Sequence, residues 1–365
     1  MGHSRGGDGV RAAYFFNRRD GGQFGIKAVF EVGPVDFGRI ASQAQPLFNA
    51  DNVAWSVLLP ACDRDVSDNQ GMRAYDRTRT IPDTNNKSPK SQIYILGTNH
   101  NHYNSEWLPE DTLFRCIDFP VITQRPDQEQ LSMTYMMGFF RTYLGGEDFK
   151  YLFSGDRKPP ANIITPVLTA YTESPNDILL VDNFSDPKSP DTNSLGGANT
   201  VANVDIKPCT GNECNEPPPG SYFHDLAMSV AKIAWPQSGT PASTETPRVT
   251  MRLGESARDV SSMNWLAVRV ASQFSLKNRV AESQNFSVRL MDATGAMSNA
   301  VALADYRQIP YPTGSFFRLS VLNTVRVPLA DFRGVDKSRV TAVQLVFDKT
   351  REGAIFLTDV HLSPR

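Results

Sequence analysis

The sequence predicts two domains of different class, an α/β domain followed by an all-β domain. Up to about residue 150, short strand-like apolar runs alternate with helix-compatible stretches, as in a sheet with helices between its strands. After about residue 175, apolar and polar residues alternate between Gly, Pro and Asn turns, which is typical of an antiparallel β-sandwich. The 365 residues are enough for two cores. We place the domains at residues 1–172 and 175–365, joined near the polar stretch YTESPND.

The elements of the first domain follow from its apolar spacing. The stretch GVRAAYFFNRR has near-helical spacing with arginines at its end, which predicts a helix over residues 9–19. Three short β-rich runs, at 25–33, 52–60 and 91–97, predict strands. The segment 127–146 predicts a closing helix, stopped by the pair Gly145 and Gly146.

The elements of the second domain are strands. The run DILLVDNFSD opens the domain, and AIFLTDVHLS closes it. Between them, alternating apolar positions predict further strands near residues 249–253, 266–270, 286–290 and 343–347.

Charge and hydropathy exclude two classes of partner. The net charge of −2 argues against nucleic acid, and no apolar run reaches the roughly 18 residues of a membrane span. We therefore expect neither a nucleic-acid partner nor a membrane partner.

The four cysteines predict disulfides rather than a metal site. Cys209 and Cys214 lie in a polar loop with no His or further Cys nearby to complete a zinc site, so we expect them to pair. Cys62 and Cys116 are the candidates for a second bridge, across the first domain. Disulfides favour an oxidising compartment, so we expect a secreted or periplasmic protein. We expect no metal and no cofactor.

The N-terminus carries the pattern G-x-S-x-G, from Gly2 to Gly6, with Ser4 at its centre. In such a motif the serine lies on a strained turn between a strand and a helix, and glycines are needed where side chains would collide with the backbone. The helix half of that turn follows Ser4, but the sequence indicates no strand before it.

Acidic residues follow the predicted strand at 52–60. Asp63 and Asp65 lie just beyond it, where a hydrolase of this kind presents the acid of its triad. The spacing favours Asp63 and leaves Asp65 as the alternative. As a non-catalytic alternative, such residues form a solvated turn or cap a helix.

A histidine follows the next predicted strand. His100 lies on the loop after Gly97, where a base can reach both a serine and a carboxylate, and His102 is the competing candidate. Ser4, Asp63 and His100 occur in the chain order Ser, Asp, His that the α/β-hydrolase fold requires.

The motifs GHSRGG, LLPACDRDVSDNQG and GTNHNHYNSEW together resemble secreted bacterial α/β-hydrolases, akin to the dienelactone-hydrolase and cutinase-like polyesterase group, over about residues 1–150. The resemblance implies Ser4 as nucleophile, Asp63 as acid, His100 as base and the backbone N–H of Arg5 as an oxyanion donor. It also implies that the family's first strands and its second oxyanion donor precede Ser4. We therefore expect the C-terminal half of an α/β-hydrolase sheet, N-terminally truncated, with the activity belonging to the intact parent.

The first and last strands of the second domain, with TVRVPLADF and VTAVQLVFD between them, resemble the galactose-binding-like jelly rolls of carbohydrate-binding modules. The resemblance implies a possible glycan partner, stacked on an exposed Trp235, Tyr311 or Phe316. Asp182 and Asp359 are candidates for a shared calcium, although two carboxylates are too few for a site.

The expected function is that of a serine hydrolase that cleaves carboxylic esters, small or polymeric, through an acyl-enzyme. The alternative is a non-catalytic glycan-binding or adhesion protein whose first domain is a scaffold. A triad of this kind also permits peptidase activity.

Overall fold

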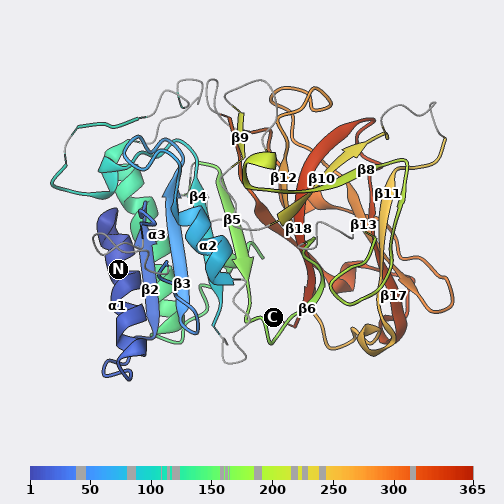
Figure 1. The fold of residues 1–365 in the computed structure, drawn as a ribbon, viewed down its shortest axis with the longest axis horizontal. Helices are drawn as coiled ribbons and strands as arrows, with labels where there is room; N and C mark the ends of the chain where they lie inside the picture. Colours follow the sequence, from blue (N-terminus) through green and yellow to red (C-terminus); the bar gives the residue numbers. More distant parts are fainter. Residues whose placement is uncertain are drawn as a thin grey trace. The chain divides into compact units, whose positions relative to one another are not determined.

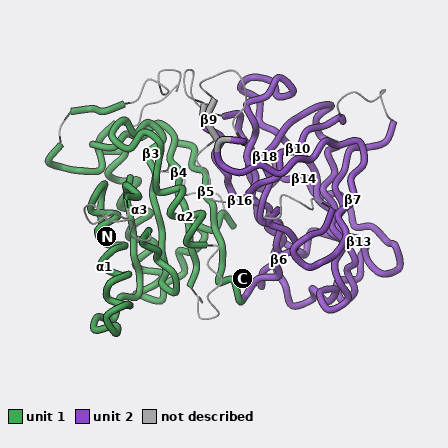
Figure 2. Tube along the Cα trace, in the orientation of Figure 1, with its two compact units in different colours: residues 1–176, 314–317 green, residues 177–313, 318–365 purple. Residues whose placement is uncertain are grey.

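The structure is a computed structural model, and the chain divides into two compact units (Figure 2). The first takes in residues 1–176, and the second takes in most of the chain from Asp177 onward, so the division falls within the predicted linker stretch. The residues described are 1–37, 47–79, 88–107, 109–112, 116, 124–156, 160, 163, 165–184, 191–214, 221–223, 229–237, 244–312 and 318–364.

The first unit is built on a sheet whose strands are ordered as they occur in the chain, β1-β2-β3-β4-β5 (Figure 1). The first four strands are parallel and the last is antiparallel to its neighbour. Since parallel strands run in one direction, the carboxyl ends of β1, β3 and β4 lie at the same edge of the sheet. The strands are β1 (Gly2–His3), β2 (Ala28–Val32), β3 (Ala54–Pro60), β4 (Lys90–Ile95) and β5 (Val167–Thr172).

Helices cover both faces of this sheet. Successive strand residues point to opposite faces. One face, which includes Phe30 and Leu58, packs against Tyr135 and Phe139 of α3 in an apolar cluster. The other face, which includes Glu31 and Trp55, meets α1 and α2. The helices are α1 (Arg5–Arg19), α2 (Gly71–Arg79), α3 (Arg125–Tyr143) and the short α4 (Tyr151–Ser154).

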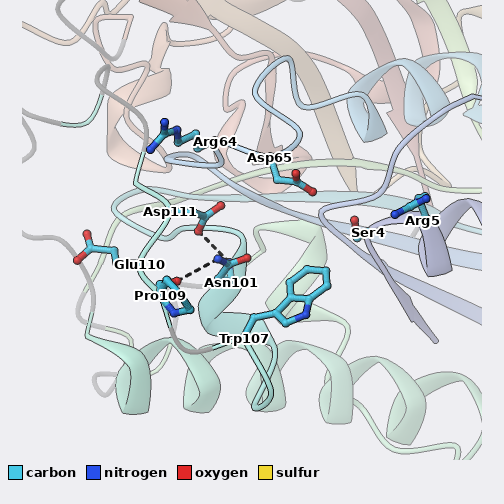
Figure 3. Close-up of a pocket in the computed structure, with 9 residues that line it drawn as sticks. All are labelled: Ser4, Arg5, Arg64, Asp65, Asn101, Trp107, Pro109, Glu110 and Asp111. Atoms are coloured by element: carbon cyan, nitrogen blue, oxygen red, sulfur yellow. Dashed lines mark hydrogen bonds between the residues drawn. The ribbon is translucent and has the colours of Figure 1, made fainter.

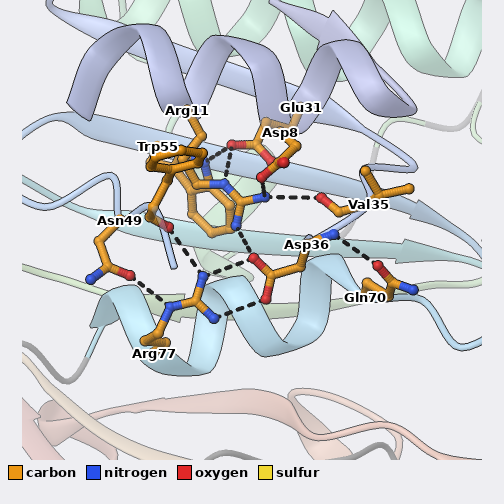
Figure 4. A network of polar contacts seen from close by, with 10 residues as sticks. Asp8, Arg11, Glu31, Val35, Asp36, Asn49, Trp55, Gln70 and Arg77 are labelled. Carbon is orange, nitrogen blue, oxygen red and sulfur yellow. Dashed lines mark hydrogen bonds and ion pairs between the residues drawn. The ribbon is translucent and has the colours of Figure 1, made fainter. Parts of the chain in front are cut away.

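The face toward α1 and α2 contains a buried network of charged groups (Figure 4). Arg11 of α1 lies 2.8 Å from Asp36 and 3.4 Å from Glu31 of β2. Arg77 of α2 donates two hydrogen bonds of 2.8 Å to Asp36, and the indole of Trp55 donates one of 2.6 Å to Glu31. Burial raises the pKa of Glu31 to about 7, against the opposing effects of Arg11 and Trp55. The network ties α1 to β2, and it ties both α1 and α2 to Asp36 in the segment that follows β2.

The second unit is a sandwich of two mainly antiparallel sheets, which confirms the predicted β-sandwich. One sheet has the order β16-β12-β18-β10-β8, with β6 paired to β18, and the other has the order β14-β13-β17-β11-β7. A small third sheet pairs β15 with β9. The strands are β6 (Leu179–Asp182), β7 (Asn199–Ala202), β8 (Asp205–Thr210), β9 (Ser221–Phe223), β10 (Ser229–Trp235), β11 (Arg248–Arg252), β12 (Trp265–Ser272), β13 (Ser287–Asp292), β14 (Val301–Ala302), β15 (Arg318–Ser320), β16 (Asn323–Pro328), β17 (Val340–Val346) and β18 (Gly353–Ser363).

One large apolar cluster forms the core of this sandwich. Val268 of β12, Leu290 of β13 and Leu345 of β17 belong to it and are fully buried. Such a core follows from alternation, because every second residue of a strand faces the opposite sheet.

Trp235 belongs to the same core, which corrects the prediction that it is an exposed sugar-stacking residue. Its side chain is fully buried, and its ring stacks on Phe347 with centroids 4.3 Å apart. The strand alternation around it, in SVAKIAW, places it on the inward face.

Two disulfides are present, and both pairings agree with the sequence prediction. Cys209 is bonded to Cys214, and Cys62 is bonded to Cys116. In the described ranges, no helix is long and apolar enough to span a bilayer.

Candidate functional site

Ser4 lies on a sharp turn between β1 and α1. Its backbone has φ 57° and ψ −126°, a positive-φ conformation that costs free energy for a residue with a side chain. The sequence indicated no strand ahead of this turn, and that expectation is wrong. Gly2 and His3 pair in parallel with Glu31 and Val32, and the Ser4 N–H donates to the Val32 carbonyl at 2.9 Å.

Two glycines near Ser4, Gly2 and Gly7, are required by close contacts. A Cβ on Gly2 would lie 1.9 Å from the Gly6 carbonyl oxygen, and one on Gly7 would lie 2.6 Å from Cβ of Pro34. Both distances are far below van der Waals contact. Gly6, the second glycine of the motif, has open space around it, so of the two motif glycines only Gly2 is required by the tightness of this strand-to-helix turn.

His100 and Asp63 form a buried pair at the same edge of the sheet. Asp63 follows β3 and His100 follows β4, and His100 Nδ1 lies 2.8 Å from an Asp63 carboxylate oxygen. The other carboxylate oxygen of Asp63 accepts the Val66 N–H at 2.6 Å, which fixes the side chain.

The two alternatives, Asp65 and His102, occupy different positions. The carboxylate of Asp65 is 3.5 Å from His100 Nε2, on the opposite side of the ring from Asp63, and its side chain is 61% exposed. His102 instead contacts the side-chain amide of Asn99 at 3.1 Å. The geometry therefore pairs Asp63, not Asp65, with His100 Nδ1.

Gly33 is a residue of this site that the sequence analysis did not single out. It follows β2 with φ 47°, and a Cβ there would lie 3.1 Å from His100 Nδ1 and 3.2 Å from an Asp63 carboxylate oxygen. A side chain at this position would push apart the histidine and the carboxylate. The only signal in the sequence is a glycine directly after a predicted strand.

Two neighbouring histidines of the site, His100 and His3, have pKa values shifted in opposite directions. Burial alone would lower the pKa of His100, but the hydrogen bond and charge of Asp63, with the charges of Asp65 and Asp111, raise it above its usual value. His3 lies with its ring centroid 4.4 Å from that of His100. Burial and the charge of His100 lower the pKa of His3 to about 4, so His3 is neutral at physiological pH.

The disulfide Cys62–Cys116 joins the loop that carries Asp63 to the segment that follows the histidine loop. Asp63 and Thr112 also form an isolated β-bridge between the same segments. Asp111 accepts the Asn101 N–H at 2.9 Å, which links this segment to the turn after His100. Covalent and hydrogen-bonded links thus limit the movement of Asp63 relative to His100.

A pocket of about 490 Å³ opens beside Ser4 (Figure 3). Ser4 and Arg5 lie on one side of it, and Glu110 and Asp111 lie on the other. Arg5 is the first residue of α1, so its N–H has no acceptor within the helix and is available to an anion. The pocket can therefore hold a carbonyl group next to both Ser4 and a backbone donor.

The candidate binding residues of the second unit that the structure describes make other contacts. Tyr311 is half-buried and meets the ring of Phe274 edge-on at 6.2 Å, and Phe316 lies outside the described residues. Asp182 accepts hydrogen bonds from the Phe184 N–H and the Asn199 amide, and Asp359 lies 3.7 Å from Arg269. In the described part of the chain, no group of three or more His, Cys, Asp or Glu side chains could hold a metal ion.

No family model and no curated protein matches the chain. Several solved structures are similar to it. A family 11 carbohydrate-binding module of a Clostridium thermocellum cellulosomal cellulase has 12% identity and a TM-score of 0.31, over 51% of this chain and 94% of that one. An exo-β-agarase has 15% identity and a TM-score of 0.30, over 52% of this chain and 25% of that one. A family 30 carbohydrate-binding module has 13% identity and a TM-score of 0.27, over 46% of this chain and 85% of that one.

Proposed function

We propose that the first unit is a serine hydrolase of the α/β-hydrolase type that cleaves carboxylic esters. The observation that carries the proposal is the placement of three residues at the edge of the sheet where its parallel strands end. These are Ser4 on a positive-φ turn between β1 and α1, Asp63 after β3, and His100 after β4, with the last two buried and 2.8 Å apart.

The proposed chemistry assigns one role to each group. Ser4 Oγ attacks the ester carbonyl carbon while His100 Nε2 takes its proton, and the Arg5 N–H stabilises the oxyanion that forms. Asp63 holds the proton of His100 on Nδ1, so that Nε2 is the basic nitrogen. In the described residues His100 Nε2 makes no hydrogen bond, to Ser4 or to any other group, and the Asp65 carboxylate lies 3.5 Å from it. In the proposed step this nitrogen accepts the proton of the Ser4 hydroxyl.

The acyl-enzyme is then resolved by water. The alcohol leaves with the proton from His100, and a water molecule gives its own proton to the same nitrogen as it attacks the acyl carbon. The products are a carboxylic acid and an alcohol, with Ser4 restored.

The substitution Ser4→Ala tests the proposal. We expect it to lower kcat on p-nitrophenyl acetate by about 10⁴-fold or more and to leave the thermal unfolding curve unchanged. A fluorophosphonate probe should label Ser4 in the wild-type chain, as read by peptide mass spectrometry. Ser256→Ala, which changes an exposed serine of the second unit, is the matched control and should retain both the turnover of p-nitrophenyl acetate and the fluorophosphonate labelling of Ser4. Full turnover in Ser4→Ala would refute the proposal.

A second candidate function is glycan binding by the second unit, with the first unit as a scaffold. What favours it is the two-sheet sandwich, an architecture that sugar-binding domains share by analogy of fold. Depletion of the chain from solution by insoluble polysaccharides, together with absence of fluorophosphonate labelling, would favour this function over the hydrolase.

We also propose that the protein works in an oxidising compartment, outside the cell or in the periplasm. Two disulfides with no free cysteine in the described residues support this proposal. Thiol titration of the protein isolated from its native source tests it, since free thiols would contradict it.

A further inference from the structure

The pocket beside Ser4 is lined mainly by polar and charged groups. Five of its nine lining residues carry charge, two basic and three acidic, and Ser4 and Asn101 add neutral polar groups. Trp107 and Pro109 are the two apolar members. Most small-molecule pockets are lined predominantly by hydrophobic side chains. This lining offers many hydrogen-bond donors and acceptors and little apolar surface for an aliphatic chain.

Trp107 is held in this pocket although it is substantially exposed. Its side chain is 45% accessible, which is unusual for a tryptophan that only packs. Its ring lies 6.2 Å from that of His100, nearly parallel at 21°, and 5.9 Å from that of His3. A partly exposed indole therefore lies in the pocket with its ring 6.2 Å from the ring of the proposed base.

The backbone around Trp107 is fixed by α3. Arg125, the first residue of that helix, donates one hydrogen bond to the Asn104 carbonyl at 2.8 Å and another to the Trp107 carbonyl. A guanidinium that binds two carbonyls of one turn limits the freedom of the loop. The exposed indole is thus presented in a defined position rather than on a loose loop.

A flat aromatic face surrounded by hydrogen-bonding groups fits one class of molecule best. Polyhydroxylated rings have C–H groups on a face that packs on an indole, and hydroxyls at the rim that pair with carboxylates, guanidinium groups and amides. A long acyl chain would bury charged groups without giving them partners, at a cost in free energy.

We propose that the substrate is an ester of a sugar, in which a short acyl group is carried by a sugar hydroxyl and the sugar ring lies on Trp107. This inference rests on the proposed function and adds the substrate class. The bond from the acyl carbon to the sugar oxygen breaks as the bond to Ser4 Oγ forms, and the sugar oxygen takes the proton from His100. Water then releases the acid, so the products are a free sugar hydroxyl and a short carboxylic acid.

The test compares two acetate esters that differ in hydroxyl groups, a mono-acetylated methyl glucoside and cyclohexyl acetate, with acetate release as the readout. We expect kcat/KM to be at least about tenfold higher for the sugar ester. In Trp107→Ala we expect a loss of about tenfold in kcat/KM for the sugar ester, mostly through KM, with partial recovery in Trp107→Phe. Met137→Ala removes an exposed apolar side chain of α3 outside the pocket and should leave both rates unchanged.

The outcomes separate the two proposals. If p-nitrophenyl acetate is hydrolysed but cyclohexyl acetate is cleaved as well as the sugar ester, or Trp107→Ala does not change the ratio, the sugar-ester inference is overturned and the hydrolase stands. If neither ester nor p-nitrophenyl acetate is turned over and no fluorophosphonate labels Ser4, the hydrolase itself is overturned. Circular dichroism of each variant excludes misfolding as the cause of a loss.

Discussion

The two units of this chain use their sheets in different ways. In the first unit, parallel strands end at one edge, so residues far apart in the sequence, Ser4, Asp63 and His100, follow strands that finish at the same edge of the sheet. In the second unit, antiparallel strands end alternately at opposite edges, and the side chains gather instead into an apolar cluster between two sheets. Both sheets bury an apolar face, so the comparison teaches that strand direction decides whether the residues that follow successive strands collect at one edge.

The units also differ in what holds their layers together. Helix α1 is tied to the first sheet by Arg11, whose side chain is fully buried among the carboxylates of Glu31 and Asp36. The layers of the second unit meet through apolar contacts such as those of Val268 and Leu345. A buried ion pair is costly to break because the remaining charge is left without a partner.

The largest effect is therefore expected from Arg11→Met. It leaves Glu31 and Asp36 buried with one cation fewer and should destabilise the first unit by about 3–5 kcal/mol. Hydrogen exchange measured by mass spectrometry should show faster exchange in β2 and β3, with no change in β13 and β17.

The control for this variant is Arg252→Met, an exposed arginine of the second unit with the same change of side chain. It should leave the exchange of both units unchanged. Equal loss of protection in both units after Arg11→Met would break the comparison, because the two units would then unfold as one.

The sequence predicted strands and helices better than it predicted their ends. The strands β2, β3 and β4 lie where continuous apolar runs placed them, because such runs are buried on both faces of a covered sheet. The order Ser4, Asp63, His100 also follows from sequence, since each residue comes after a recognisable strand or turn. The contact between Asp63 and His100 Nδ1 agrees with the preference for Asp63 over Asp65.

Other features depend on contacts that a linear pattern does not contain. The two residues of β1 are too few for periodicity, and they become a strand only by pairing with β2. Gly33 matters because two side chains from other strands meet above it. Trp235 looks like a binding residue in isolation, and only the opposite sheet shows that it is buried. Tertiary contacts, rather than local propensity, decide all three.

The next largest effect is expected from removing the disulfides, because they close loops of different length in the two units. Cys62–Cys116 closes a sequence separation of 54 residues in the first unit, and Cys209–Cys214 closes one of 5 in the second. On the chain-entropy account, replacing both cysteines by serine should cost about 4 kcal/mol for the long loop and about 2 kcal/mol for the short one.

Hydrogen exchange measured by mass spectrometry can follow the protection of backbone amides in each unit separately. Cys62→Ser with Cys116→Ser should lower protection in β3, and Cys209→Ser with Cys214→Ser should lower it less, in β8 and β10. A larger loss from the short loop would contradict the chain-entropy account. The long-loop variant should also lower kcat on p-nitrophenyl acetate, because Asp63 directly follows Cys62.

The smallest effect is expected from Asp65→Asn, which tests whether the charges at the edge of the first sheet control the proposed base. His100 must be neutral to accept a proton, and its pKa is raised by Asp63, Asp65 and Asp111 against the opposing effect of burial. Removing the carboxylate 3.5 Å from Nε2 destabilises the imidazolium, so the pKa of His100 falls. The acidic limb of the kcat/KM profile should then move to lower pH. The shift should be modest and smaller at high salt, because solvent screens an exposed carboxylate.

Asp68→Asn, in the same loop and paired with Arg73, is the matched control and should leave the acidic limb in place. A shift to higher pH in Asp65→Asn, or the same limb in both variants, would show that a group other than His100 in this environment accepts the proton.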